Sequence, residues 1–237
     1  MKKINTILAA FGAVLMLSVT SANSVEFKAG ISANAMAAYA NAKETLKGTV
    51  TSTQGGGRVS SEEAIMATSY ASVFAEVSSD ELMGLGLGVS YAPEVADLSK
   101  ETRHIGMPVA DSGNDAAGGA QIVDGKINDL LGIYLTLPVG DGGAYVKAGY
   151  IQATMVTEES LATGSKYEDV DLYGYSVGGG YEGSLGDMAF WRAEGTYQMW
   201  DDIAANGSES DGDDNTTNRI EAELGSVTGS LSLGMKF

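Results

Sequence analysis

The side chains of this sequence alternate between apolar and small or polar types along eight stretches, each of roughly ten residues. The alternation is clearest between residues 189 and 199. Trp191 and Tyr197 lie on one face there, whereas Arg192 and Glu194 lie on the other. Successive side chains of a β-strand point to opposite faces, so a period of two indicates strands rather than helices. Repeated stretches with an apolar and a polar face are typical of a membrane β-barrel, in which one face meets lipid.

Glycine is unusually frequent in this sequence. The chain contains 32 glycines among 237 residues, about twice the usual share of ~7%. In one stretch Leu85 and Leu87 alternate with Gly86 and Gly88. The inward face of a narrow barrel must fit side chains from every strand into little volume, so we expect small residues inside and large apolar ones outside.

The connections between the stretches also alternate in length. Three are tight (78–81, 138–142 and 183–187) and four are long and polar (41–64, 92–126, 157–169 and 201–217). Eight strands joined in this way predict an all-β fold, a transmembrane antiparallel up-and-down barrel with both termini in the periplasm. Ten strands, with an extra hairpin inside 92–126, are the alternative for the barrel. A soluble secreted β-sandwich, which also alternates, is the third interpretation.

The second stretch, residues 65–77, does not reveal its phase. Val73, Ala75 and Val77 compete with Tyr70 and Phe74 for the outward positions. Its orientation is left open by the sequence.

The first 24 residues have the order of a secretory signal peptide. Lys2 and Lys3 precede an apolar run from 7 to 19, which is followed by small residues. The run is too short for a transmembrane helix, which needs roughly 20 residues. We therefore expect a signal peptide at 1–24 and a barrel domain at 25–237.

Composition excludes several classes of function. The chain has no cysteine and one histidine, so zinc fingers, iron–sulfur clusters, bis-histidine haem and disulfide frameworks are excluded, and we expect no cofactor. Its formal net charge of −17 would repel a nucleic acid.

The last strand, residues 227–237, alternates apolar residues and ends in Phe237. With the signal peptide and the rhythm of loops and turns, it resembles the small eight-stranded outer-membrane barrels of the OmpA transmembrane-domain, OmpW and opacity-protein type. The resemblance implies a Gram-negative outer-membrane protein, in contact with lipid and lipopolysaccharide. It also implies an assembly signal read by the outer-membrane insertion machinery, carried by Leu231, Leu233, Met235 and Phe237.

Four charged residues are candidates for a network in the lumen. Arg192 and Glu194 are two apart on one strand and point the same way, while Lys147 and Asp171 are assigned to the polar faces of nearby strands. One interpretation is a charged gate on a narrow water path, as interior ion pairs of OmpA-like barrels imply. The other is a purely structural network of ion pairs, because charges that point into the lumen must be paired whether or not ions or solutes pass through it.

Two further features favour no chemistry. Asp211, Asp213 and Asp214 begin like a calcium loop, but Thr216 and Ala222 stand where an EF-hand needs Gly and Glu, so this acidic loop is a weak candidate and no metal site is predicted. His104 lies in a polar segment with no strand pattern that would hold it beside Asp111 or Ser112. The chain is therefore not expected to be an enzyme.

The sequence thus favours a monomeric, structural barrel whose four long external loops make surface contacts, including those with phage or host. A small channel that passes ions or small solutes through a charged lumen is the alternative. Eight strands enclose a space that side chains can fill, which favours the first interpretation.

Overall fold

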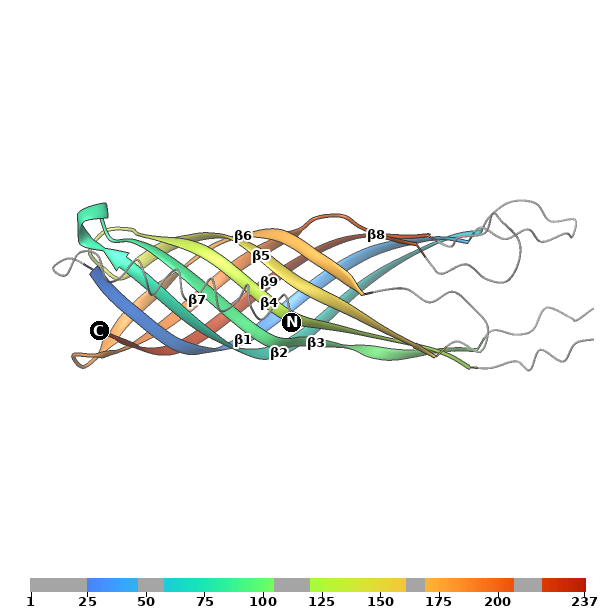
Figure 1. Cartoon of the computed structure of the whole chain (residues 1–237), viewed down its shortest axis with the longest axis horizontal. Coiled ribbons are helices and arrows are strands. Elements are labelled where there is room, and N and C mark those ends of the chain that lie inside the picture. Colours follow the sequence, from blue (N-terminus) through green and yellow to red (C-terminus); the bar gives the residue numbers. More distant parts are fainter. Residues whose placement is uncertain (1–24, 47–57, 105–119, 161–168, 207–218) are drawn as a thin grey trace, which may run out of the picture.

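The computed structural model describes residues 25–46, 58–104, 120–160, 169–206 and 219–237. They form one antiparallel sheet that closes on itself, because the first strand also pairs with the last. Figure 1 shows the resulting elongated barrel. The elements are β1 (Val25–Leu46), β2 (Arg58–Ser79), η1 (Asp80–Leu82), β3 (Leu85–His104), β4 (Ala120–Pro138), β5 (Ala144–Ser160), β6 (Val170–Leu185), β7 (Ala189–Trp200), β8 (Ile203–Asn206) and β9 (Arg219–Lys236).

Eight strands surround the lumen. β7 and the short β8 pair with the same strand, β9, one after the other: Met199 lies opposite Gly225 and Ile203 lies opposite Ala222. They therefore occupy one position in the wall. The prediction of a closed eight-stranded barrel is confirmed, and a two-sheet sandwich is wrong because there is one continuous sheet.

The strands are longer than the alternation predicted. β3 continues to His104 and β4 begins at Ala120, with these two residues opposite each other. The expected long connection 92–126 is thus mostly strand, and the ten-stranded alternative is wrong. β1 and β2 likewise remain paired as far as Leu46 and Arg58. Backbone pairing can continue after the side-chain alternation ends, since a strand pair that has water on both faces needs no apolar face.

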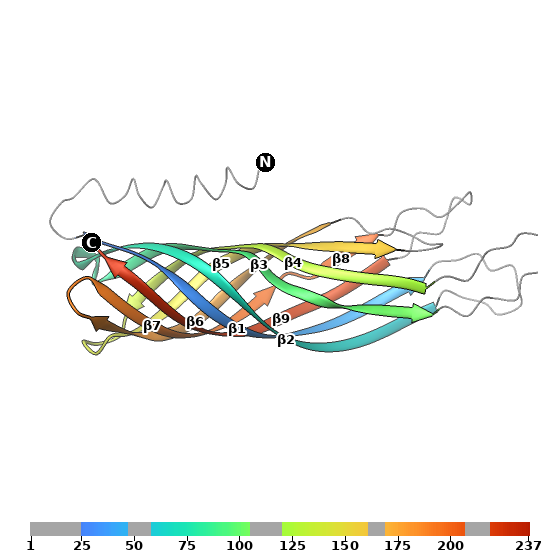
Figure 2. The same cartoon turned by 90° about the horizontal axis from the view of Figure 1, so that it is seen from below.

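The tight connections gather at one end of the barrel, called the turn end here. They lie close to the three predicted tight turns, and Gly84 supplies the left-handed backbone, with φ of 75°, that the first of them needs. Figure 2 shows the C-terminus at this end. Phe237 exchanges backbone hydrogen bonds with Phe27, at 2.8 and 3.2 Å, which continues the β1–β9 pairing to the last residue. The opposite end is called the loop end.

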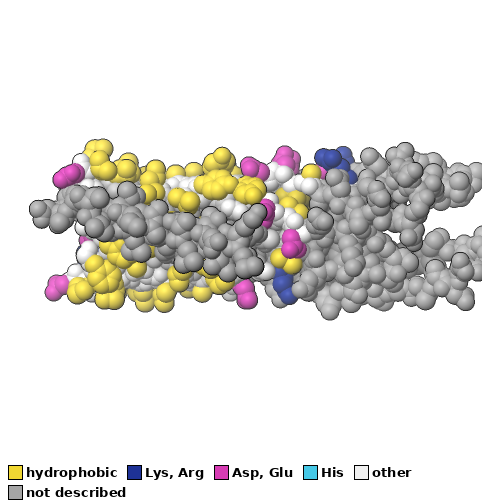
Figure 3. All heavy atoms as spheres, in the orientation of Figure 1, with side chains coloured by type: hydrophobic (Ala, Val, Ile, Leu, Met, Phe, Trp, Pro, Cys, Tyr) yellow, Lys and Arg dark blue, Asp and Glu magenta, His cyan; other side chains and the backbone are white. Residues whose placement is uncertain are grey.

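The outer wall is apolar. Ile31, Leu231 and Leu233 are 64%, 68% and 58% exposed, as the predicted phases of their strands require. Hydrophobic side chains cover most of the described wall visible in Figure 3 toward the turn end. No helix among the described residues is long and apolar enough to cross a membrane.

β2 adopts the phase that the sequence left open. Phe74 points inward and is buried, whereas its neighbour Val73 is 44% exposed. The inward aromatic ring fits because Gly30, its partner on β1, has no side chain: a Cβ there would lie 2.7 Å from the ring.

Candidate functional site

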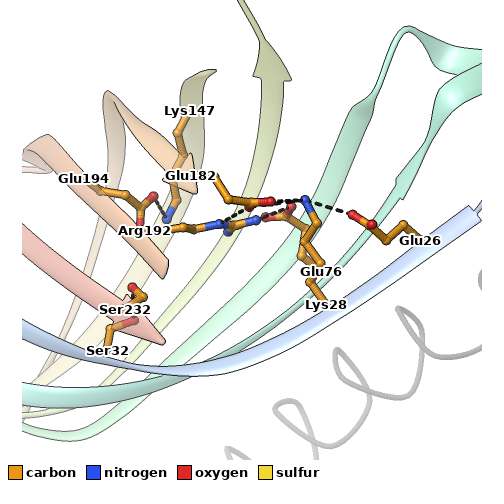
Figure 4. A network of polar contacts seen from close by, with 9 residues as sticks. All are labelled: Glu26, Lys28, Ser32, Glu76, Lys147, Glu182, Arg192, Glu194 and Ser232. Carbon is orange, nitrogen blue, oxygen red and sulfur yellow. Dashed lines mark hydrogen bonds and ion pairs between the residues drawn. The ribbon is translucent and has the colours of Figure 1, made fainter. Parts of the chain in front are cut away.

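The lumen near the turn end is closed by a cluster of charged side chains centred on Arg192. Its guanidinium donates to both carboxylate oxygens of Glu76, at 2.8 and 2.9 Å, and its Nε donates to Glu182 at 2.7 Å. Figure 4 shows these side chains converging from β2, β6 and β7. Arg192 and Glu76 are 3% and 2% exposed. A bidentate, charge-assisted pair of this kind is both strong and geometrically specific.

Two lysines complete the cluster. The Lys28 ammonium lies 2.9 Å from Glu182, which therefore bridges Lys28 and Arg192, and 3.1 Å from Glu26 at the rim. Lys147 pairs with Glu194 at 2.9 Å. Apart from the rim carboxylate, the cluster contains three cations and three carboxylates, so its formal charge is balanced. Balance of this kind is what burial of charge requires.

Aromatic rings fill the space around the ion pairs. The guanidinium carbon of Arg192 lies 5.1, 5.3 and 5.4 Å from the ring centres of Phe190, Phe74 and Tyr145, and Lys147 lies 4.0 Å from that of Tyr134. These distances are those of cation–π contacts. The rings also remove space that water would otherwise occupy, so the charges meet each other rather than solvent.

The inward glycines make this packing possible. A Cβ at Gly88 would overlap the Tyr134 ring, and one at Gly86 would lie 3.2 Å from a carboxylate oxygen of Glu76. The predicted use of glycine, to relieve crowding inside the barrel, is confirmed at these two positions.

A layer of hydroxyl and amide groups follows toward the loop end. Ser32 and Ser232 share a hydrogen bond of 2.8 Å, and Asn34 donates to Ser72 at 3.0 Å and accepts from Ser230 at 2.7 Å. A cavity of about 70 Å³ lies beside this layer, and its lining reaches from Arg192 and Glu194 of the ion cluster to Leu130 and Ile151. It has room for a few water molecules at most.

A third layer is apolar. It consists of side chains that point inward at the height where the polar face of the alternation would continue, among them Met36, Ala92, Leu130, Ile151, Ala153, Leu172 and Ile203. Leu130 lies in this layer with the inward phase of Gly132 and Tyr134. Next to it the β4–β5 register shifts between Asn128 and Leu131, Asp129 has a φ of 56°, and Ile127 packs against the layer although it has the outward phase of Ile133. A bulge of this kind redirects a side chain to the other face. The lumen is thus filled by ion pairs and, further along, by hydrocarbon.

The structure brings together three of the four predicted lumen charges. Arg192, Glu194 and Lys147 point inward, near one another. Asp171 does not join them: it is exposed, and it lies opposite Thr154, whereas Lys147 lies opposite Gly178 on the same two strands. Asp171 follows the phase of the outward-facing Tyr173, so its assignment to the polar face of β6 is wrong.

Sequence reasoning missed Glu76, Glu182 and Lys28. Glu182 follows the inward phase of Gly178 and Gly180, and Lys28 follows that of Ser32, so continuing the alternation would have found both. Glu76 lies on the strand whose phase was left open.

The other predicted residues fall into two groups. The proposed assembly-signal residues Leu231, Leu233, Met235 and Phe237 all face outward. The acidic residues Asp211, Asp213 and Asp214 lie outside the described residues, as does the expected signal peptide at 1–24. Within the described ranges no group of three or more carboxylate or histidine side chains is placed to hold a metal ion.

The closed sheet, the apolar wall and the filled interior are those of an outer-membrane-type β-barrel. No family model and no curated protein matches the chain. Solved barrels are similar at low identity. OprG from Pseudomonas aeruginosa is 11% identical over 89% of this chain and 97% of its own, with a TM-score of 0.43.

Two further structures cover similar shares. Ail, the attachment invasion locus protein of Yersinia pestis, is 11% identical over 88% of this chain and 99% of its own, with a TM-score of 0.38. The outer membrane protease OmpT from Escherichia coli is 12% identical over 90% and 97%, with a TM-score of 0.46. Similarities of this size carry no substrate or partner over to this chain.

Proposed function

We propose that this protein is a structural barrel of a Gram-negative outer membrane, with a closed lumen and a surface-interaction role at its loop end. The observation that carries the proposal is the double filling of the lumen, by the cluster around Arg192 and by the apolar layer around Leu172. An ion would have to displace bidentate hydrogen bonds and then cross a layer made mainly of hydrocarbon, beside which Gln198, Ser226 and Thr228 are hydrogen-bonded to one another.

The same proposal assigns an orientation. Short turns face the periplasm in barrels of this type, so both termini would lie there, after export directed by residues 1–24. The apolar wall contacts lipid and lipopolysaccharide, and the outward residues of β9 would be read by the insertion machinery. The loop end then faces the outside, where phage or host surfaces are the expected contacts. A monomer is sufficient, and no catalytic role is proposed.

The test is planar-bilayer conductance of the refolded chain 25–237, once heat-modifiable gel mobility shows a folded barrel. The proposal predicts no discrete conductance steps from the wild type, or from Arg192→Ala, because the apolar layer stays in place. The matched control is Arg219→Ala, which removes an exposed ion pair with Glu221. Discrete steps in the wild type that Arg192→Ala changes and Arg219→Ala leaves alone would contradict a closed lumen.

A gated channel is the second candidate, and one observation favours it. Glu182 contacts both Arg192 and Lys28, so Arg192 can lose Glu76 and still keep a carboxylate partner. An exchange of this kind would keep every charge paired only if Lys28 moved from Glu182 to Glu76 at the same time. The apolar layer lies in series with it, however, so a channel requires that both layers open.

A further inference from the structure

The strands β2 and β3 stop pairing part-way along the wall. Their ladder ends at Val73, opposite Tyr91. β2 nevertheless stays paired with β1 on its other side as far as Arg58. Figure 1 shows the β1–β2 and β3–β4 hairpins on separate sides of the loop end. From Arg58 up to Val73, the side of β2 that faces away from β1 therefore has no partner strand among the described residues.

The two unpaired edges differ in how they are protected. On β3, Pro93 has no N–H, and the Val95 carbonyl already accepts a hydrogen bond of 3.0 Å from the Thr68 hydroxyl. The register between β3 and β4 also shifts twice beyond Pro93. Proline and bulges of this kind keep natural edge strands from pairing with another chain. β2 has neither, because it contains no proline and its register with β1 is unbroken, so its edge is the one left able to accept a further strand.

The apolar outer wall ends part-way along this edge. Ile65 lies opposite Tyr39, whose hydroxyl shares a hydrogen bond of 3.3 Å with that of Tyr197. Tyrosines favour the boundary between hydrocarbon and water. Closer to the loop end, the next outward side chain of β2 is the exposed carboxylate Glu63. The β2 edge from Arg58 to Ala64 thus lies outside the hydrocarbon, where water can solvate its unpaired backbone groups until a partner strand replaces the water.

The outward side chains of this edge define what a partner must carry. Ile65 is 87% exposed, so a strand beside it buries most apolar surface by placing an apolar side chain opposite. Glu63 is two residues earlier on the same face and is best met by a cation. The charged side chains that the structure describes along the two facing edges, Glu63 and Glu94, are both exposed carboxylates, and the chain has a formal net charge of −17. Charge therefore favours a cationic partner.

We propose that the β2 edge between Arg58 and Ala67 binds an extended cationic peptide by strand addition, antiparallel to β2. The main chain supplies the hydrogen bonds, and alternate side chains supply the selectivity. In an antiparallel partner, the residue opposite Ile65 comes two positions before the residue opposite Glu63. The preferred partner therefore has an apolar residue followed, two positions later, by lysine or arginine. This inference deepens the surface-interaction role proposed above and rests on an outward loop end, but it does not depend on a closed lumen.

Fluorescence anisotropy of a labelled peptide with the folded chain 25–237 in detergent micelles tests the proposal. The probe is a short peptide with threonine on one face and with valine and lysine alternating on the other. We expect saturable binding of this peptide, and none of the same peptide with its backbone nitrogens methylated, because methylation removes the donors of the ladder. Glu63→Lys should weaken binding about tenfold, since a like charge replaces an opposite one. Asp141→Lys changes an exposed carboxylate of the turn end and is the matched control, which should bind as the wild type does.

An exchange of charges separates recognition at this edge from general attraction to an acidic protein. A second peptide, with glutamate in place of lysine, should bind Glu63→Lys about tenfold more tightly than it binds the wild type. Ile65→Thr should weaken binding of the first peptide while leaving its preference for Glu63 intact, because only the apolar contact is reduced.

Four results would overturn the proposal: no saturable binding by the wild type, equal binding of the methylated peptide, equal weakening by Glu63→Lys and Asp141→Lys, or a glutamate peptide that does not prefer Glu63→Lys. Peptide added to intact cells that carry the protein tests the orientation separately. Binding in micelles without binding to cells would contradict an outward loop end and leave the β2 edge as the binding site. The conductance test of the lumen is independent of both measurements.

Discussion

The two halves of the lumen are filled by opposite kinds of side chain. Near the turn end, buried charges are held by one another, with Arg192 donating to two carboxylates. Toward the loop end, Leu172 and its neighbours pack as hydrocarbon. The first half depends on every partner being present, because one lost partner leaves a buried charge. The second depends on volume, and its losses grow with the cavity that is left. Substitutions should therefore affect the two halves by different rules.

The largest expected effect is that of Arg192→Ala. It leaves Glu76 buried without a cation, which should lower the free energy of unfolding by about 3–5 kcal/mol. Urea unfolding of the barrel in lipid vesicles, followed by gel mobility, measures the change. Arg219→Ala is the control and should change stability by at most ~1 kcal/mol, since that ion pair is exposed. Equal effects of the two variants would contradict a buried, interdependent cluster.

Leu172→Ala tests the apolar half. The side chain is 2% exposed, and removing it should lower the free energy of unfolding by about 2–5 kcal/mol through lost burial and a cavity. Leu172→Met, which nearly conserves volume, should cost less than ~1.5 kcal/mol. The same urea experiment compares them. If methionine were as harmful as alanine, the layer would not be governed by volume.

Gly88→Ala tests whether an inward glycine is needed to make room for the aromatic rings around the ion cluster. Its methyl group would overlap the buried Tyr134 ring, so we expect a loss of about 1–3 kcal/mol. Gly229→Ala on β9, where a Cβ meets nothing within 4 Å, should be tolerated. Combining Gly88→Ala with Tyr134→Leu should cost less than the sum of the two single changes, whereas additive effects would show that the residues do not compete for space.

The smallest effect is expected in the hydroxyl layer. Ser232→Ala removes one neutral hydrogen bond to Ser32 and should cost about 0.5–1.5 kcal/mol. Ser32→Ala with Ser232→Ala should cost no more than the single change, because neither hydroxyl is then left without its partner. A larger loss in the double variant would mean that these hydroxyls take part in a wider network.

How far the sequence predicts this structure differs between the wall and the interior. The wall follows from alternation, so the outward positions of Ile31, Tyr150 and Leu231 were predictable from single stretches. The interior depends on which residues face each other across strands. Phe74 can point inward because Gly30 lies opposite it, and Ile127 packs in the interior because of a bulge that no period of two encodes. Glu76 was missed for the first of these reasons, since its strand could not be phased alone.

The early end of the pairing between β2 and β3 could not be predicted from the sequence either. Pro93 was readable as a break in a strand pattern. The end of the ladder at Val73 and Tyr91, however, is a property of two strands together.

The most direct test of the closed lumen is single-channel conductance of variants that open the two layers separately and together. One variant carries Glu76→Ser and Arg192→Ser, a second carries Leu130→Ser and Leu172→Ser, and a third carries all four, each checked for folding by heat-modifiable mobility. We expect no discrete conductance steps from the wild type or from either partial variant, and discrete steps only from the fourfold variant. Steps from the wild type, or from the variant that loses only Glu76 and Arg192, would contradict it.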